Sequence, residues 1–329
     1  MTRFVFATQK IDPEDPLLGA AVPKIRALAA RVDEVVVLAG EAVDGALPDN
    51  CRVRLFGAES QFARGRLFAT ALNRELRPRP IAVLSHMVPL YAILAAPLTR
   101  PRRVPLILWF THWKVTRRLK LAERLATAVV TVDRRSFPFE SRKVVPIGHG
   151  IDMRAFPCVN REPGDRLRVI ALGRTSPAKG LETIARAAEL AGAELELRGP
   201  SLTDEERAER ARLAARGIRV EEPLPHSAIA GLLARKDVLV NNMREGSLDK
   251  VVYEAAATCM PVLASNSGFD DVLPPELRFV RDDAEDLAAK LRAVAGSNRA
   301  EIGRALRAEV EERHSVEHWA DAVLEVAQR

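Results

Sequence analysis

Two glutamates on either side of a glycine-containing turn are the residues of this chain whose types and spacing could do chemistry. Glu245 and Glu254 are separated by eight residues, and the turn between them begins with Gly246 and Ser247. The glycine lets the backbone approach a ligand closely, and free N–H groups at the start of a following helix form an anion site. Carboxylates accept hydrogen bonds from hydroxyls but are poor partners for phosphate. The stretch therefore suits a phosphorylated sugar or nucleotide, with phosphate on the backbone and hydroxyls on the acids.

A second stretch combines a glycine with two cations. The segment 167–172 predicts a buried strand, and Gly173, Arg174 and Lys179 follow it before a helix with apolar spacing from Leu181. A guanidinium offers a bidentate fork to a phosphate, and an ammonium offers a point charge.

The elements that must position these residues read as repeated strand–helix units. Segments 3–8 and 33–38 predict strands on either side of a helix over 22–30, which is a βαβ unit. Helix 62–76 is expected to turn Phe62, Leu67 and Phe68 inward. The pattern restarts at Leu167, and residues 300–328 predict a helical C-terminus whose buried face holds His318, Trp319, Val323, Leu324 and Val326. The alternation predicts an α/β fold with parallel sheets.

Together the two stretches resemble the signatures of retaining glycosyltransferases with the GT-B architecture, in particular family 4 (group 1). The resemblance covers most of the chain and is strongest over 111–264. It implies two Rossmann-like, doubly wound domains facing across a cleft, with a C-terminal helix crossing back to the first domain. The implied domains are an acceptor-side domain over 1–153, a donor domain over 154–312 and the returning helix over 313–329.

The resemblance also implies roles for particular residues. Glu245 would contact the donor sugar, Glu254 the ribose, and Arg174 with Lys179 the diphosphate. His112, which follows the expected strand 106–110, matches a histidine that faces the sugar from the first domain. The implied catalytic residues are His112, Arg174, Lys179 and Glu245; the implied donor-binding residues are Gly19, Gly173, Pro200, Leu224, His226, Gly246, Ser247, Leu248 and Glu254.

This sequence departs from the family pattern in two places. Seven residues usually separate the paired glutamates, whereas here there are eight, and Gly19 is the single match to a usual glycine pair. Structural interpretations also stay open: Glu254 as a solvated helix residue, Ser247 or Asp249 as an N-cap, and His112 as a histidine bonded to a loop carbonyl. His226 can likewise be structural, beside Ser227 as the N-cap of a helix over 228–234.

Composition indicates an ordinary soluble protein, with 47% apolar and 29% charged residues. The N-terminus lacks a signal peptide's apolar core, and no apolar run approaches 18 residues. The three cysteines, Cys51, Cys158 and Cys259, are far apart and odd in number, so we expect neither a disulfide framework nor a metal site, as in a reducing cytoplasm. No Asp-x-Asp pair is present, and no metal or other cofactor is expected.

The two halves of the chain differ in net charge. Residues 1–155 contain 25 Lys and Arg against 14 Asp and Glu, a net of +11, whereas residues 156–329 have a net of −5. Basic clusters at 100–103 and at Lys114, Arg117, Arg118 and Lys120 predict contact with an anionic or lipid-linked acceptor or with the inner face of the cell membrane. No nucleic-acid partner is expected.

The expected function is transfer of a hexosyl group, with retention and without metal, from a nucleoside-diphosphate sugar to an acceptor hydroxyl of a cell-envelope glycan, glycolipid or polysaccharide. Two other classes stay open. A nucleotide-sugar epimerase on the same fold would need an added acid–base set. An inactive, nucleotide-sugar-binding partner subunit would fit the longer Glu245–Glu254 spacing.

Overall fold

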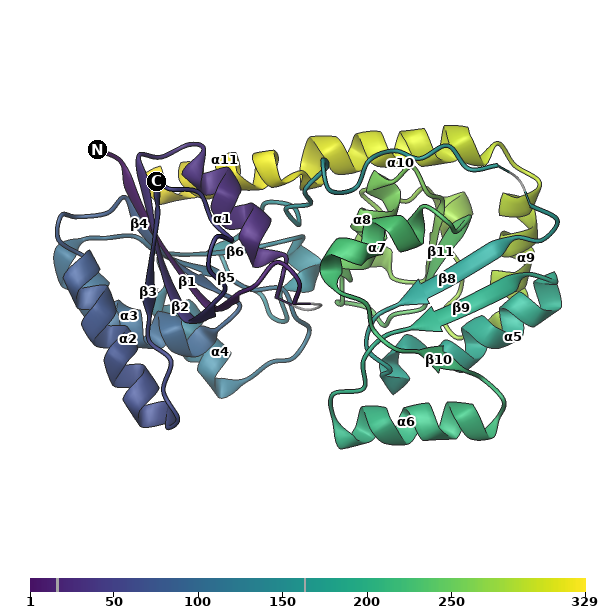
Figure 1. Ribbon diagram of the computed structural model, residues 1–329, viewed down its shortest axis with the longest axis horizontal. Helices are drawn as coiled ribbons and strands as arrows, with labels where there is room; N and C mark the ends of the chain where they lie inside the picture. Colours follow the sequence, from purple (N-terminus) through teal and green to yellow (C-terminus); the bar gives the residue numbers. More distant parts are fainter. Residues whose placement is uncertain (16–17, 163) are drawn as a thin grey trace. The chain divides into compact units, whose positions relative to one another are not determined.

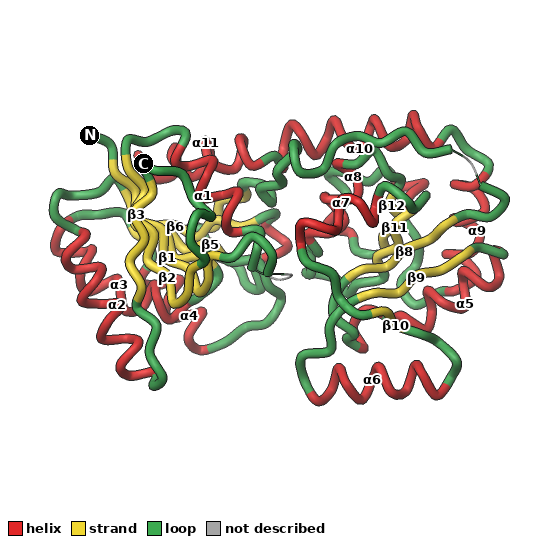
Figure 2. The backbone as a smooth tube through the Cα atoms, viewed as in Figure 1, coloured by secondary structure: helices red, strands yellow, loops and turns green. Residues whose placement is uncertain are grey.

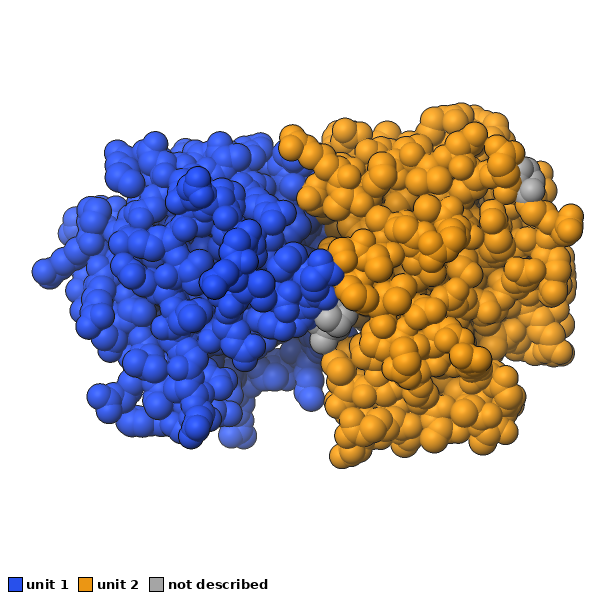
Figure 3. Space-filling model, viewed as in Figure 1, with its two compact units in different colours: residues 1–150, 313–329 blue, residues 151–312 orange. Residues whose placement is uncertain are grey.

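The computed structural model describes residues 1–15, 18–162 and 164–329. The described chain forms two compact units, which Figure 3 colours separately. Unit 1 comprises residues 1–150 and 313–329, and unit 2 comprises residues 151–312. The sequence pattern places the corresponding boundaries after residues 153 and 312.

Unit 1 alternates strands and helices for most of its length (Figure 1). In chain order its elements are β1 (Arg3–Ile11), α1 (Ala21–Ala29), β2 (Glu34–Ala42), β3 (Cys51–Leu55), α2 (Gln61–Glu75), β4 (Ala82–His86), α3 (Pro89–Thr99), η1 (Arg100–Arg102), β5 (Leu106–Trp109), α4 (Arg117–Leu125), β6 (Ala128–Thr131), η2 (Arg134–Ser136), β7 (Val144–Pro146) and α11 (Val316–Gln328). Among the described residues the strands form one parallel sheet in the order β3-β2-β1-β4-β5-β6-β7.

Different helices cover the two faces of this sheet (Figure 2). Successive residues of a strand point to opposite faces, so Val5 packs in the core shared with α2, α3 and α4, whereas Phe6 contacts the ring of His86 at 5.3 Å. On that second face α1 packs against α11, and the rings of Trp109 and Trp319 meet edge to face at 5.6 Å. Burying the sheet on both sides is what a doubly wound unit requires.

Two details of the helices in unit 1 differ from expectation. Phe62 and Leu67 are 77% and 46% exposed, because α2 packs through Phe68, whose ring stacks on Tyr91 of α3 at 5.0 Å. The expected single C-terminal helix is broken at Ser315, whose hydroxyl caps α11 by accepting from the backbone N–H of residue 318. His318 itself is exposed. No described helix combines the length and apolar character that crossing a bilayer needs.

Unit 2 repeats the arrangement with a smaller sheet. Its elements are β8 (Arg168–Leu172), η3 (Pro177–Lys179), α5 (Leu181–Ala191), β9 (Glu194–Arg198), α6 (Asp204–Ala215), β10 (Val220–Glu221), α7 (His226–Leu233), β11 (Val238–Asn241), α8 (Lys250–Ala257), β12 (Val262–Ala264), η4 (Ser267–Phe269), η5 (Pro275–Leu277), α9 (Ala284–Ala295) and most of α10 (Arg299–His314). The described strands are parallel, in the order β10-β9-β8-β11-β12. The order of connection reverses between β8 and β11, and open α/β sheets bind ligands at such a point, outside the carboxyl ends of the strands.

Unit 2 contains a disulfide between Cys158 and Cys259, which are 101 residues apart. The expectation that none of the three cysteines is paired is therefore wrong. The pairing arises because the turn after α8 lies beside the segment that opens unit 2, a proximity that no local sequence pattern reveals. Cys51, in unit 1, is a free thiol.

Replacing both Cys158 and Cys259 by serine should destabilise unit 2. The disulfide closes a loop of about 100 residues, so we expect a loss of about 3–5 kcal/mol in the free energy of unfolding. Calorimetry should show a lower melting temperature for the double variant, and the same shift in the wild-type protein after reduction with a dithiol. Cys51→Ser is the matched control. Equal melting temperatures for the double variant and the wild type would contradict the cross-link.

Candidate functional site

The predicted residues of unit 2 gather on loops that leave one edge of its sheet. Gly173 and Lys179 lie between β8 and α5, and Glu245 to Asp249 lie between β11 and α8. Because β8 and β11 are paired in parallel, with Leu239 opposite Ile170, both loops start at the carboxyl end of the sheet where the strand order reverses. The fold therefore brings together two motifs that are about seventy residues apart in the sequence.

Lys179 is held at the centre of this loop pair. Its Nζ lies 2.5 Å from Oδ2 of Asp249 and donates a hydrogen bond to the carbonyl of Leu172 at 3.0 Å. The side-chain amide of Asn241 donates to the same Asp249 oxygen at 2.9 Å. Lys179 is only 8% exposed, so its ammonium is fixed at the end of β8 and its charge faces a carboxylate.

The glycine of this loop makes room for that lysine. Gly173 has φ +125°, and a Cβ atom built on it would lie 2.5 Å from Lys179 Nζ. Any other residue would displace the ammonium. Glycine at this position therefore adopts a φ that other residues rarely adopt and leaves the space in which the Lys179 ammonium lies.

Arg174 points to a different partner. Its guanidinium is 3.3 Å from Oε1 of Glu206 on α6, and its side chain is 44% exposed. The loop that carries it is tied to the neighbouring one, since the N–H of Thr175 donates to the carbonyl of Pro200 at 2.9 Å. Arg174 and Pro200 thus lie on adjoining loops after β8 and β9.

Glu254 is buried in α8, and its carboxylate contacts the side chains of a histidine and a lysine. Its Oε1 lies 2.7 Å from His226 Nε2 and 2.8 Å from Lys250 Nζ, and Lys250 Nζ also contacts His226 Nε2 at 2.8 Å. The residue is 3% exposed, so its interpretation as a solvated helix residue is wrong. Burial alone would raise the pKa of Glu254, but the charge of Lys250 and the hydrogen bond from His226 outweigh it and lower the pKa to about 2.

His226 opens α7 and connects Glu254 with the segment before it. The N-cap of α7 is Pro225, which corrects the expectation of a helix capped by Ser227. The ring of His226 also meets that of Phe156 at 5.9 Å. Leu224, two residues earlier, is half-buried.

The loop from Glu245 to Leu248 is fastened to the turn after β12. The carboxylate of Glu245 accepts hydrogen bonds from the backbone N–H and the hydroxyl of Ser267, at 2.9 and 2.8 Å. The amide of Asn266 donates to the carbonyl of Ser247 at 2.8 Å. Leu248 is buried against Gly268, and Gly246 has φ +78°, so the glycine here serves the turn.

Two predicted residues belong to unit 1. Gly19 is buried, and its N–H donates to the carbonyl of Asp15 at 3.0 Å. His112 Nδ1 accepts from the N–H of Lys114 at 3.0 Å, and its ring stacks on Trp113 at 5.4 Å. The position of His112 after β5 is as predicted, whereas its relation to a donor rests on the resemblance alone.

Three residues of the unit 2 site were not assigned a functional role from the sequence. Asp249 was considered only as an N-cap, and although it is at that position in α8 its side chain makes no capping hydrogen bond. It lies in the segment between the paired glutamates, which is one residue longer than usual. That extra length was the sequence feature that could have drawn attention to Asp249. Lys250 stands four residues before Glu254, a spacing that places both on one helix face. No sequence pattern pointed to Asn241.

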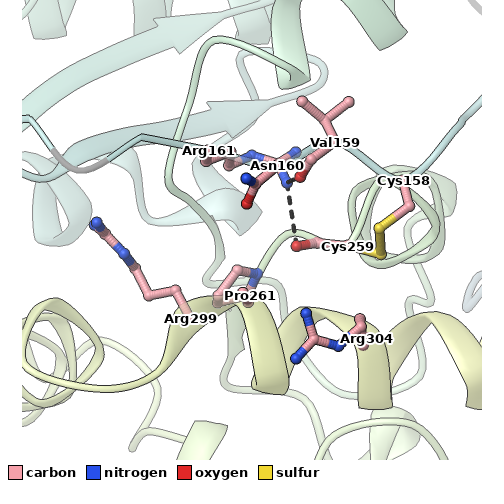
Figure 4. A pocket seen from close by; sticks show the side chains of 9 residues that line it. Cys158, Val159, Asn160, Arg161, Cys259, Pro261, Arg299 and Arg304 are labelled. Carbon is pink, nitrogen blue, oxygen red and sulfur yellow. Dashed lines mark hydrogen bonds between the residues drawn. A yellow bond between two sulfur atoms is a disulfide. The ribbon is translucent and has the colours of Figure 1, made fainter.

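A separate cavity of about 270 Å³ in unit 2 holds none of the predicted residues (Figure 4). The disulfide of Cys158 and Cys259 lines it together with Arg161. The guanidinium of Arg161 donates to the carbonyls of Thr258 at 2.8 Å and Cys259 at 3.1 Å, and burial lowers its pKa to about 10. Arg161 therefore fastens the turn after α8 and supports the site indirectly.

Comparison with solved structures identifies the fold. Sucrose-phosphate synthase from Thermosynechococcus elongatus matches with a TM-score of 0.75 and 18% identity, over 99% of this chain and 98% of that one. The HepE protein of Anabaena, in complex with UDP-glucose, matches with a TM-score of 0.76 and 16% identity over 99% of both chains. A putative UDP-N-acetylglucosamine 2-epimerase from Listeria monocytogenes matches at 0.62 and 14%, over 98% and 94%. The chain has the GT-B fold, as predicted.

A family model gives the more particular result. Residues 174–325 match the model described as "Glycosyl transferase-like", a range that begins at Arg174 and includes the whole Lys179–Glu254 site. No curated protein matches the sequence. The predicted resemblance to GT-B glycosyltransferases is thereby confirmed.

The low pKa of Glu254 predicts an acid-dependent stability. Because the pKa falls from 4.5 to about 2 on folding, ionised Glu254 contributes stability that is fully present above about pH 4.5 and is lost as the pH falls toward 2. The contribution is about 3 kcal/mol. Glu254→Gln should lower the melting temperature at pH 7 and flatten its dependence on pH below 4.5, as measured by calorimetry.

The control for this measurement is Glu205→Gln, an exposed glutamate on α6. It should keep the wild-type melting temperature and pH profile. A Glu254→Gln profile parallel to that of the wild type throughout the acid range would show that the carboxylate contributes nothing through its ionisation.

Proposed function

We propose that the protein is a retaining glycosyltransferase of family 4 that transfers a hexosyl group from a nucleoside-diphosphate sugar to an acceptor hydroxyl. The observation that carries the proposal is the site at the strand reversal of unit 2, where a fixed ammonium lies on the loop after β8 and a buried, ionised carboxylate lies in α8, the helix that follows the neighbouring loop. The match to a glycosyl transferase-like model over the same residues supports it, and so does a shared fold with a protein that binds UDP-glucose.

The chemistry of the side chains suggests how a donor would be held. Lys179 and Arg174 would bind the diphosphate, the first as a point charge and the second as a fork. Glu254 stays ionised well below neutral pH, so it can accept hydrogen bonds from the ribose hydroxyls. Glu245 would contact the sugar, on the exposed side of the turn. Pro200, Leu224 and His226 would face the base.

In the proposed reaction the bond between the anomeric carbon and the diphosphate oxygen breaks, and the acceptor hydroxyl attacks on the same face. Negative charge develops on the leaving diphosphate, where Lys179 and Arg174 would stabilise it. The departing phosphate would take the acceptor proton, so no protein nucleophile is required. His112 would steady the sugar as positive charge develops on its ring. We propose that no metal ion takes part.

Lys179→Ala should lower turnover by about 10²–10³-fold, because it removes a charge aimed at the leaving group. The donor is first chosen by melting-temperature shifts with UDP, GDP and ADP sugars in the presence of EDTA. A ligand at 100 times its dissociation constant should add about 2.7 kcal/mol. Release of the nucleoside diphosphate is then followed for the wild type and the variant.

Lys290→Ala, which changes a lysine of α9, is the matched control and should keep wild-type turnover. Unchanged turnover in Lys179→Ala would overturn the assignment of this residue. The same assay separates the other classes: an epimerase alters the sugar without releasing nucleoside diphosphate, and an inactive partner subunit binds the donor without turnover. Loss of activity in EDTA would overturn the proposed metal independence.

The acceptor side of the proposal rests on the start of α4. Lys114, Arg117, Arg118 and Lys120 are exposed, and among the described residues their side-chain nitrogens make no hydrogen bond or ion pair. Cations in the first turn of a helix oppose its dipole, so the stability of α4 does not account for them. Val115 and Leu121 beside them are 44% and 45% exposed. By contrast, Arg100 and Arg102 donate to the carbonyls of Leu125 and Leu98.

We therefore propose that α4 brings the protein to an anionic membrane surface, at the inner face of the cell membrane, where a lipid-linked acceptor would be found. The protein should float with vesicles that contain phosphatidylglycerol. Replacing the four cations by serine should lower the vesicle affinity by about 10³-fold, since each contributes about 1 kcal/mol. Neutral vesicles and high salt are the controls. Equal flotation of wild type and variant would count against this surface.

A further inference from the structure

The lysine assigned to the diphosphate does not present a free charge. Lys179 Nζ and Asp249 Oδ2 are 2.5 Å apart, and both groups are largely shielded, with side chains 10% and 23% exposed. Asn241 donates to the same carboxylate oxygen at 2.9 Å. A phosphate that reaches Lys179 therefore also comes within a few ångströms of a carboxylate.

The placement of Asp249 has no other structural explanation in its own helix. It occupies the N-cap position of α8, yet its side chain caps no backbone N–H. Instead the carboxylate contacts Lys179 on the loop after β8 and accepts a hydrogen bond from the side-chain amide of Asn241 at the end of β11. The carboxylate of Asp249 thus partly neutralises the charge of Lys179 and would repel an anion bound to that lysine.

Donor and product differ in charge at this point. The distal phosphate of a nucleoside-diphosphate sugar is esterified to the sugar. In the released nucleoside diphosphate the same phosphate is terminal, and its second ionisation has a pKa near 6. At pH 7.5 the product therefore carries about one more negative charge than the donor. This charge lies on the phosphate that Lys179 would bind, close to the carboxylate of Asp249. Like charges a few ångströms apart repel, and more strongly where solvent is partly excluded.

On the basis of the proposed function, we propose that Asp249 is a specificity-determining residue that disfavours the nucleoside-diphosphate product relative to the donor. The carboxylate competes with the terminal phosphate for Lys179. Once the sugar has been transferred, the extra charge on the product strengthens this competition, and the Lys179–Asp249 pair re-forms as the product leaves. The residue would thereby limit product inhibition.

The test compares Asp249→Asn with the wild-type protein in calorimetric titrations at pH 7.5. The probes are UDP, GDP and ADP and their glucose or mannose conjugates. Asp249→Asn should bind the cognate nucleoside diphosphate about tenfold more tightly than the wild type does, the effect of removing one nearby charge. The gain for the sugar conjugate should be clearly smaller. In turnover assays, inhibition by the product should become stronger in the same proportion.

Two further variants keep the result interpretable. Asp165→Asn makes the same change at an exposed position before the amino end of β8 and should leave all affinities unchanged. Asp249→Ser removes the same charge with a different side chain, so the comparison survives a folding defect in Asp249→Asn. If the role of Asp249 were purely structural, both variants would bind the nucleoside diphosphate and the sugar conjugate more weakly, and to the same extent.

The outcomes separate this inference from the proposed function. A selective gain for the diphosphate supports the role of Asp249. Equal gains, no gain, or a loss for both ligands would overturn that role and leave the donor site standing. Absence of binding for every probe, in the wild type and in both Asp249 variants, would overturn the proposed donor site itself and the inference with it.

Discussion

The parallel pairing of β8 with β11 is the constraint on which the candidate site depends. These strands are adjacent in the sheet although β9 and β10 separate them in the chain, and Val169 lies opposite Val238. With the register fixed, the loops that follow the two strands start side by side. Lys179 and Asp249 can then meet without any further contact between their helices, and the site is a consequence of strand order.

Much of this arrangement was predictable because it follows from local patterns. Apolar runs such as 167–172 predicted the strands, and the apolar spacing from Leu181 predicted the helix that follows the loop after β8. Long-range packing decided what these patterns could not. Phe62 belongs to a helical pattern, but α2 packs on α3 through Phe68, and Phe62 is 77% exposed. The pairing of Cys158 with Cys259 likewise depends on a turn more than a hundred residues from the first cysteine.

Within the site, residue types were predictable but partners were not. The spacing of the acids points to Glu254, yet the sequence alone could not show that His226, 28 residues earlier, would share its carboxylate with Lys250. That sharing decides the charge state of Glu254, because burial by itself would raise its pKa. Similarly, the sequence marks Gly173 as part of a loop with two cations, and only the structure shows that this glycine leaves the space in which the Lys179 ammonium lies.

The pairing of charges in unit 2 determines how an anion could be recognised there. Three cations on these loops or at the start of α8 face carboxylates; the pairs are Arg174–Glu206, Lys179–Asp249 and Lys250–Glu254. Residues 156–329 moreover have a net charge of −5, so this half of the chain lacks the positive field that would draw phosphate from a distance. Under the proposed function, the diphosphate would compete for Lys179 with a carboxylate that already lies 2.5 Å from it. Because a shielded charge that loses its partner is costly, the proposed donor would have to satisfy both members of a pair, through its hydroxyl groups as well as its phosphates.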